Sequence, residues 1–249
     1  MADLLRSDNP VLKEKAFSGA IATGETMTLQ GTVNKTGLLL LFVVGTAAWT
    51  WGLAHSETPD AVYPWLLGGA LGGLVVGMIT AFKMEWAPFL APIYALLEGL
   101  FLGGISALFE RSYPRIAMQA VSLTFAVMLV MLLAYKFRIV QATRGFKLGV
   151  IAATGGIFLV YMANLVATLV FHAPFGILYS SSPLGIGISL VITIIAALNL
   201  ILDFDMIETG VRIGAPKYME WYGAFGLMVT LIWLYLEILR LLSKLRSRD

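Results

Sequence analysis

Seven stretches of this chain are long and apolar enough to cross a lipid bilayer. A membrane-spanning helix needs about 20 predominantly apolar residues, because that length covers a hydrocarbon core of about 30 Å. The stretches lie at roughly residues 36–54, 63–82, 87–109, 116–135, 148–171, 184–207 and 221–242. They predict an all-α, polytopic membrane protein whose fold is a bundle of seven transmembrane helices.

The composition indicates that lipid is the solvent for most of the chain. Of its 249 residues 59% are apolar and only 13% are charged, whereas a soluble domain usually carries about 25% charged residues. The net charge of +2 and the absence of a basic patch give no support for nucleic-acid binding. Residues 1–35 are polar and lack an apolar core, so we expect no signal peptide in them. We therefore expect a cytoplasmic N-terminal arm at 1–35 and a transmembrane domain at 36–245.

The distribution of basic residues among the loops predicts the orientation in the membrane. If the N-terminus is cytoplasmic, eleven of the 17 Lys and Arg residues fall on the cytoplasmic side and five on the other. Cytoplasmic loops carry an excess of Lys and Arg, so the N-terminus is expected inside and, with seven spans, the C-terminus outside. The basic C-terminal tail opposes this placement. A re-entrant segment would make both ends cytoplasmic, so the side of the C-terminus stays open.

The sequence gives little support for an enzyme. It contains no HExxH, GxSxG or Walker motif, no cysteine and only two histidines. Asp203 and Asp205 could suggest an intramembrane aspartyl protease, whose two carboxylates must share a proton. Residues two apart on a helix point about 200° away from each other, so this pair cannot form such a dyad. We expect no enzymatic activity and no cofactor.

Four acidic residues within the predicted spans are candidates for function, because a carboxylate in hydrocarbon persists only where it is paired, protonated or facing water. Glu98 lies near the bilayer centre, either as a neutral acid bonded to a neighbouring helix or as a pore-facing group that binds a cation. Asp203 and Asp205 lie near the cytoplasmic end of the sixth span, with Asp205 closer to water. Glu237 lies in the seventh span, and its i,i+3 spacing from Arg240 favours an ion pair.

Three motifs on these spans resemble a known family. They are Glu98-Gly-Leu in the third span, Asp203 with Ile207 in the sixth, and Trp233-Leu-Tyr-Leu-Glu-Ile-Leu-Arg-Leu-Leu242 at the end of the seventh. Together they resemble the Bax inhibitor family (TMBIM, YccA-like), and the polar N-terminus resembles its bacterial branch. The resemblance implies a multi-pass protein of a bacterial inner (cell) membrane that lets cations, chiefly calcium, leak across it.

The resemblance also implies a pH-sensitive latch formed by two aspartates, one on each of the last two helices. Asp203 matches the aspartate of the sixth helix, but two registers are possible for its partner. Matching Leu-Tyr-Leu-Glu gives Glu237, whereas matching Leu-Arg-Leu-Leu gives Thr230. At 1.5 Å per residue, Asp203 should lie about 6 Å inside the cytoplasmic boundary, Thr230 about 13 Å and Glu237 about 24 Å. These depths favour Thr230, which would leave the two-acid latch incomplete.

Carboxylates are therefore expected to line or gate an ion path. Asp203 and Glu98 are the expected metal ligands, since hard oxygen donors suit calcium and a sparse set lets the ion leave. Further candidates for the path or its gating are Asp205, Glu237, Thr230 and Arg240. Protonation of these acids would make the leak pH-sensitive. The alternative function is a non-conducting regulator that binds another membrane complex, such as a protease or a secretion component.

Overall fold

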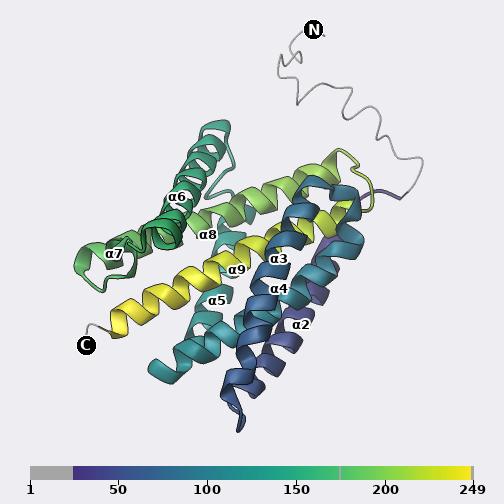
Figure 1. Ribbon diagram of the computed structural model, residues 1–249. Helices are drawn as coiled ribbons and strands as arrows, with labels where there is room; N and C mark the ends of the chain where they lie inside the picture. Colours follow the sequence, from purple (N-terminus) through teal and green to yellow (C-terminus); the bar gives the residue numbers. More distant parts are fainter. Residues whose placement is uncertain (1–24, 174, 248–249) are drawn as a thin grey trace, which may run out of the picture.

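The computed structural model describes residues 25–173 and 175–247, and seven long helices make up most of this part of the chain. The long helices are α2 (Leu29–Ala54), α3 (Tyr63–Phe82), α4 (Ala87–Ser112), α5 (Ile116–Lys136), α6 (Arg144–Phe171), α8 (Pro183–Arg212) and α9 (Met219–Arg246). Three short helices lie in the connections: η2 (Pro59–Val62), η3 (Met84–Trp86) and α7 (Gly176–Tyr179). All seven long helices are long and apolar enough to cross a membrane, which confirms the predicted all-α fold (Figure 1).

The helices extend beyond the apolar stretches that predicted them. Helix α2 begins at Leu29 rather than near residue 36, and the Thr28 hydroxyl caps it by accepting a hydrogen bond from the Gly31 amide at 3.0 Å. Hydropathy marks only the part of a helix that lies in hydrocarbon, whereas polar end turns continue into the interface. Residues 29–35, expected in the N-terminal arm, are therefore helical, and residues 1–24 of that arm lie outside the described residues.

Helix α9 forms the centre of the bundle. It packs against α2, α4, α5 and α8, and Figure 1 shows it running between these helices. Its side chains Leu234 and Leu239 are among the most deeply buried in the described chain. Helices α2, α3 and α4 form a tightly packed group beside it. A polar group on α9 is consequently held within the bundle rather than at its lipid-facing surface.

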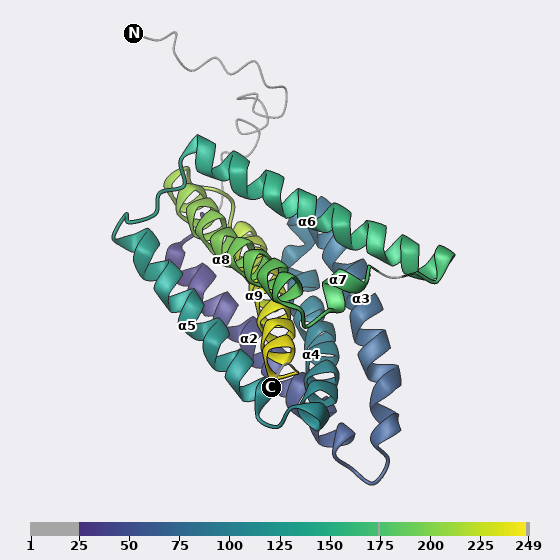
Figure 2. The same ribbon diagram turned by 90° about the vertical axis from the view of Figure 1, so that its left-hand side faces the viewer.

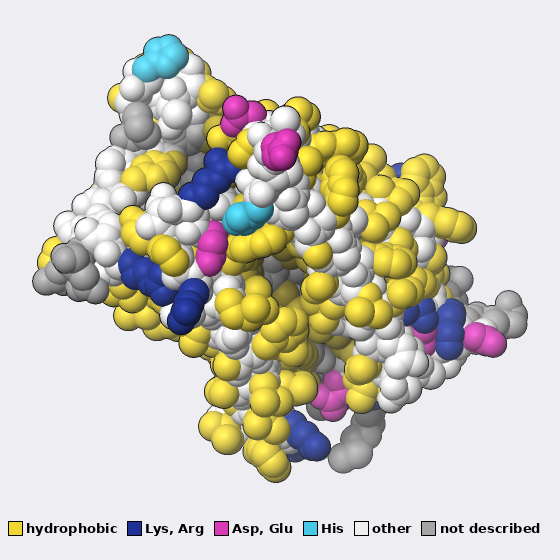
Figure 3. Space-filling view, turned by 90° about the horizontal axis from the view of Figure 1, so that it is seen from below, with side chains coloured by type: hydrophobic (Ala, Val, Ile, Leu, Met, Phe, Trp, Pro, Cys, Tyr) yellow, Lys and Arg dark blue, Asp and Glu magenta, His cyan; other side chains and the backbone are white. Residues whose placement is uncertain are grey.

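Helix α6 lies at the edge of the bundle (Figure 2) and packs mainly against α8. Most of its large apolar side chains, such as Phe158 and Leu159, are exposed. Apolar side chains also cover much of the face in Figure 3, as a lipid environment requires. Polar contacts from α6 to α8 and α9 hold it in place: Lys147 to Asp205, Thr154 to Asn199 and Tyr161 to Glu237.

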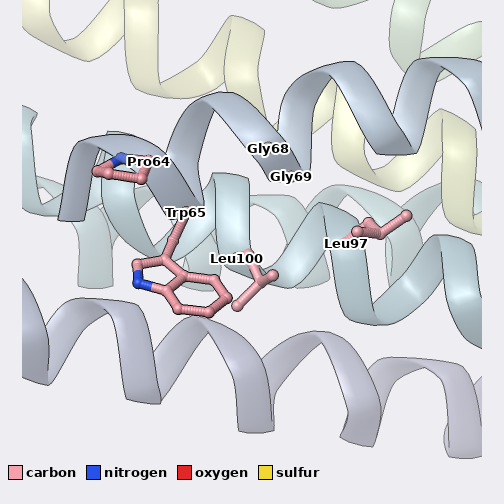
Figure 4. Close-up of a pocket in the computed structure, with 6 residues that line it drawn as sticks. All are labelled: Pro64, Trp65, Gly68, Gly69, Leu97 and Leu100. Atoms are coloured by element: carbon pink, nitrogen blue, oxygen red, sulfur yellow. The ribbon is translucent and has the colours of Figure 1, made fainter. Parts of the chain in front are cut away.

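An open apolar groove of about 310 Å³ lies between α3 and α4 (Figure 4). Its lining residues are Pro64, Trp65, Gly68, Gly69, Leu97 and Leu100. No carboxylate lines this groove, so it offers a cation no charged ligand and is distinct from the acidic sites described below.

Glycine residues on α4 allow α2 to approach closely. A Cβ atom at Gly99 would lie 2.4 Å from the carbonyl oxygen of Val43, and one at Gly103 would lie 2.2 Å from that of Ala47. Small residues four apart are typical of membrane helices whose backbones touch, because dispersion forces rather than hydrophobicity drive their association. The Gly99–Gly103 face thus fixes the distance between α2 and α4, and with it the position of neighbouring Glu98.

Replacing Gly103 with Ala should destabilise the bundle, because the added methyl group meets backbone that cannot rotate away. We expect a loss of about 1–3 kcal/mol, the usual cost of overpacking. The measurement is thermal unfolding of the purified protein in detergent. Gly68→Ala is the matched control, since a Cβ there meets nothing within 4 Å. Equal melting temperatures for the two variants would contradict the close contact.

Candidate functional site

Asp203 faces the seam between α8 and α9 and carries an unsatisfied oxygen. Its Oδ2 atom is buried without a hydrogen-bond partner, and it is the one such side-chain atom among residues 25–173 and 175–247. Thr230 of α9 is the polar side chain next to it, and a Cβ at Gly226 would lie 3.9 Å from its Oδ1. Buried polar atoms are almost always partnered, so an orphaned carboxylate oxygen indicates a site for a water, proton or ion.

The structure places Thr230, rather than Glu237, beside Asp203. Asp203 lies nine residues before the end of α8 and Thr230 eleven residues after the start of α9, about 14 Å and 17 Å along their helices. Glu237 lies another two turns along α9, about 27 Å from its start. The packing therefore pairs Asp203 with Thr230. The side chain beside Asp203 on α9 carries a hydroxyl group rather than a second carboxyl group.

Glu237 is buried in a network that satisfies both of its oxygens. Its side chain accepts hydrogen bonds from the Tyr161 hydroxyl at 2.8 Å, the Trp233 indole at 3.3 Å and Arg240 at 3.2 Å. Arg240 also donates to the Tyr161 hydroxyl at 2.5 Å. The ion pair expected from the i,i+3 spacing is thus present. It joins α9 to α6, and its geometry leaves no free carboxylate oxygen for a passing ion.

Asp205 and Glu208 point away from Asp203 toward other helices. Asp205 forms an ion pair with Lys147 of α6, and Glu208 accepts a hydrogen bond from the Tyr135 hydroxyl of α5. Asp203 and Asp205 are consequently directed at different neighbours, as their spacing on one helix requires. Asp205 links α8 to α6, and the structure does not bring it to the α8–α9 seam.

Glu98 is 9% exposed on α4 and faces α3. A Cβ at Gly73 would lie only 2.5 Å from Glu98 Oε1, so the glycine provides the space that this carboxyl group occupies. Tyr94, one turn earlier on α4, lies beside Glu98 and packs edge-to-face on Phe225 of α9 at 5.0 Å between ring centroids. Phe225 immediately precedes Gly226, which lies next to Asp203, so this aromatic pair joins α4 to the stretch of α9 beside Asp203.

The structure does not gather the expected metal ligands into one cluster. Within the described ranges, no three Asp, Glu or His side chains lie together as a potential metal site. Asp203 and Glu98 instead occupy separate interfaces, α8–α9 and α3–α4. Among the residues that the structure describes, neither carboxylate therefore has a second acidic side chain beside it as a potential metal ligand.

Sequence reasoning missed the role of Glu220, which is fully buried at the start of α9. Its Oε1 accepts hydrogen bonds from the backbone amide and the hydroxyl of Thr28, at 2.9 and 2.7 Å. It also pairs with Lys35 and, at 3.2 Å, with Lys217. The bond to Glu220 raises the pKa of Lys217. No local signal could find this cluster, because Thr28 lies 192 residues from Glu220.

Lys244 is a second residue whose position the sequence did not indicate. It follows the predicted span at 221–242, but it lies within α9 and is 4% exposed. Its ammonium donates to the Gly185 carbonyl at 3.1 Å and to the Ser189 hydroxyl at 2.7 Å. These bonds fix the end of α9 to the first turns of α8, opposite the Glu220 end of the bundle.

A search of curated proteins gave no match, and a search of solved structures likewise gave none. The sequence does match the family described as Bax inhibitor 1 like, over residues 9–247. That match covers nearly the whole chain and includes every helix described above. Seven membrane-spanning helices and this match together establish that the chain is a multi-pass membrane protein of the Bax inhibitor 1 like family.

Proposed function

We propose that this protein is a cation leak, with calcium as its main substrate, in which Asp203 lines or gates the ion path. The observation that carries the proposal is the buried, unpartnered Oδ2 of Asp203 at the α8–α9 seam. An ionisable group inside a membrane bundle is costly, and it is typical of ion and proton pathways. The function expected for the family supports the same assignment.

The chemistry of the surrounding groups suits a weak, oxygen-based cation site. A carboxylate and a neighbouring hydroxyl are hard ligands, which calcium prefers over softer donors. A conducting path must bind an ion well enough to admit it and weakly enough to release it. One carboxylate with Thr230 beside it satisfies both conditions better than a cluster of several acids. Protonation of Asp203 removes the ligand charge, so the leak should depend on pH.

Glu98 is proposed as a second acidic position on or near the path. Its carboxyl group is buried beside Tyr94, whose ring contacts α9 through Phe225. A change at Glu98 can therefore reach the α8–α9 seam through packing. The protein is further proposed to act without an enzymatic step, in a bacterial inner membrane, with the N-terminus and the Glu220 end of the bundle on the cytoplasmic side.

The proposed leak can be tested by calcium uptake into proteoliposomes that hold the purified protein, measured from about pH 5 to about pH 8, the range over which perturbed carboxylates titrate. Uptake above that of empty liposomes, with a dependence on pH, is the expected result. Glu98→Gln keeps the shape of the side chain and removes its charge, so it should change the rate. Uptake equal to that of empty liposomes at every pH would overturn the proposal and favour the non-conducting regulator.

A further inference from the structure

A short segment before α2, residues Glu25–Thr28, crosses the end of the α8–α9 pair; we call it the strap. The Met27 amide donates to the Ala215 carbonyl at 2.7 Å, and Thr26 forms an antiparallel bridge with Pro216. Both partners lie in the loop between α8 and α9, just after Gly214. Gly214 has φ +67°, a left-handed conformation that glycine adopts without strain. The loop is thus shaped to receive the strap.

Met27 inserts its side chain between α8 and α9. It is 3% exposed, and it occupies space that glycines on both helices leave open. A Cβ at Gly210 of α8 would lie 2.8 Å from its Sδ atom, and one at Gly223 of α9 would lie 3.1 Å from Ile207 Cγ1 and 3.5 Å from Met27 Cε. Met27 therefore fills the outer part of the seam at the end of the helix pair, next to Ile207 of α8.

Met27 and Asp203 lie along the same seam between α8 and α9. Asp203 precedes Gly210 by seven residues, and Thr230 follows Gly223 by seven. Seven residues are about two helical turns, so each pair shares a helix face and is about 10 Å apart along the axis. Met27 thus lies on the same seam as Asp203 and Thr230, between them and the nearer end of the bundle.

The Glu220 cluster holds the strap in this position. Glu220 accepts two hydrogen bonds from Thr28, the last residue of the strap, and pairs with Lys35 of α2. Lys217 of the α8–α9 loop contacts both Glu220 and, at 3.6 Å, Glu25 at the other end of the strap. Charge-assisted hydrogen bonds of this kind are stronger than neutral ones. The strap is consequently held mainly at its Thr28 end, because the Lys217–Glu25 pair is exposed and contributes little.

We propose that the strap is a closure, in which Met27 blocks access to Asp203 from the end of the bundle at which α2 begins. Release of Met27 from Gly210 and Gly223 opens the seam and exposes the Asp203 carboxylate to that compartment. The inference rests on the proposed function, because it makes the strap the gate of that leak, but the blocked access can be measured without any ion flux.

Access can be measured by thiol labelling, since the natural chain contains no cysteine. Thr230→Cys places a thiol beside Asp203, and a membrane-impermeant cationic methanethiosulfonate is applied to each side of sealed vesicles in turn. Adding Met27→Ala should raise the labelling rate about tenfold from the strap side, as expected when a minor open state becomes common. Met27→Leu keeps the side-chain volume and should leave the rate low. Equal rates for the Ala and Leu variants would overturn the closure.

A disulfide across the strap then tests the link to the leak. Residues opposite each other in an antiparallel bridge have Cα atoms about 4.5–5.5 Å apart, within the range of a disulfide. Oxidation of the T26C/P216C double variant should reduce calcium flux to about a tenth or less, and reductant should restore it. Each single-cysteine variant, treated with the same oxidant, is the control.

The two experiments separate the two proposals. An unchanged leak in the cross-linked protein would overturn the strap as a gate and leave the proposed leak standing. If the wild type has no leak, the proposed function fails, and the labelling rates alone then decide whether Met27 blocks access to the seam.

Discussion

Replacing Asp203 with Asn should produce a leak that no longer responds to pH. The amide has nearly the size of the carboxyl group and is neutral at every pH, so it imitates the protonated state. In the wild type the charged form of Asp203 becomes more populated as pH rises. The calcium flux therefore changes with pH. The variant should therefore show, across the whole range from about pH 5 to about pH 8, the flux that the wild type reaches at its acidic end.

The control for this substitution is Glu208→Gln on the same helix. Glu208 is exposed and bonded to Tyr135 of α5, so its neutralisation removes an equal charge away from the seam. Calcium uptake by this variant should follow the wild-type pH profile. If Asp203→Asn follows that profile as well, Asp203 is not the group that senses pH, and the proposal loses its central residue.

The features that could be predicted from the sequence are those that depend on local patterns. The seven spans could be predicted because hydropathy is local, and their interiors agree closely with the observed helices. The depth argument for Thr230 succeeded for a similar reason: rise per residue places side chains along antiparallel helices without knowledge of packing. Errors in the spans were confined to helix ends such as that of α2, where polar residues continue a helix beyond the hydrocarbon.

The contacts that the sequence did not predict are those between distant segments. Glu220 is a glutamate at a predicted span end, and nothing nearby indicates that Thr28 and Lys35 surround it. Met27 precedes the first span in a polar stretch, yet it is buried between two other helices. Only the packing of the start of α2 against the α8–α9 loop brings these residues together, and no periodicity within one segment encodes that arrangement.

Arg240→Ala is expected to destabilise the protein strongly, at least as much as Gly103→Ala. Glu237 is 1% exposed and would keep only the Tyr161 and Trp233 hydrogen bonds, so its charge would remain buried without a counterion. Stranding one member of a buried pair usually costs about 3–5 kcal/mol. Because Arg240 itself is 35% exposed on its side chain, a loss of about 3 kcal/mol is expected. Denaturation in detergent measures it.

The double variant Glu237→Leu/Arg240→Leu separates a structural role from one in the ion path. Removing both charges leaves no unpaired carboxylate, so most of the lost stability should return. The calcium leak through the double variant should keep its pH response, because Asp203 and Thr230 are unchanged. A double variant that is stable but conducts no calcium would contradict the structural role and place this pair on the ion path.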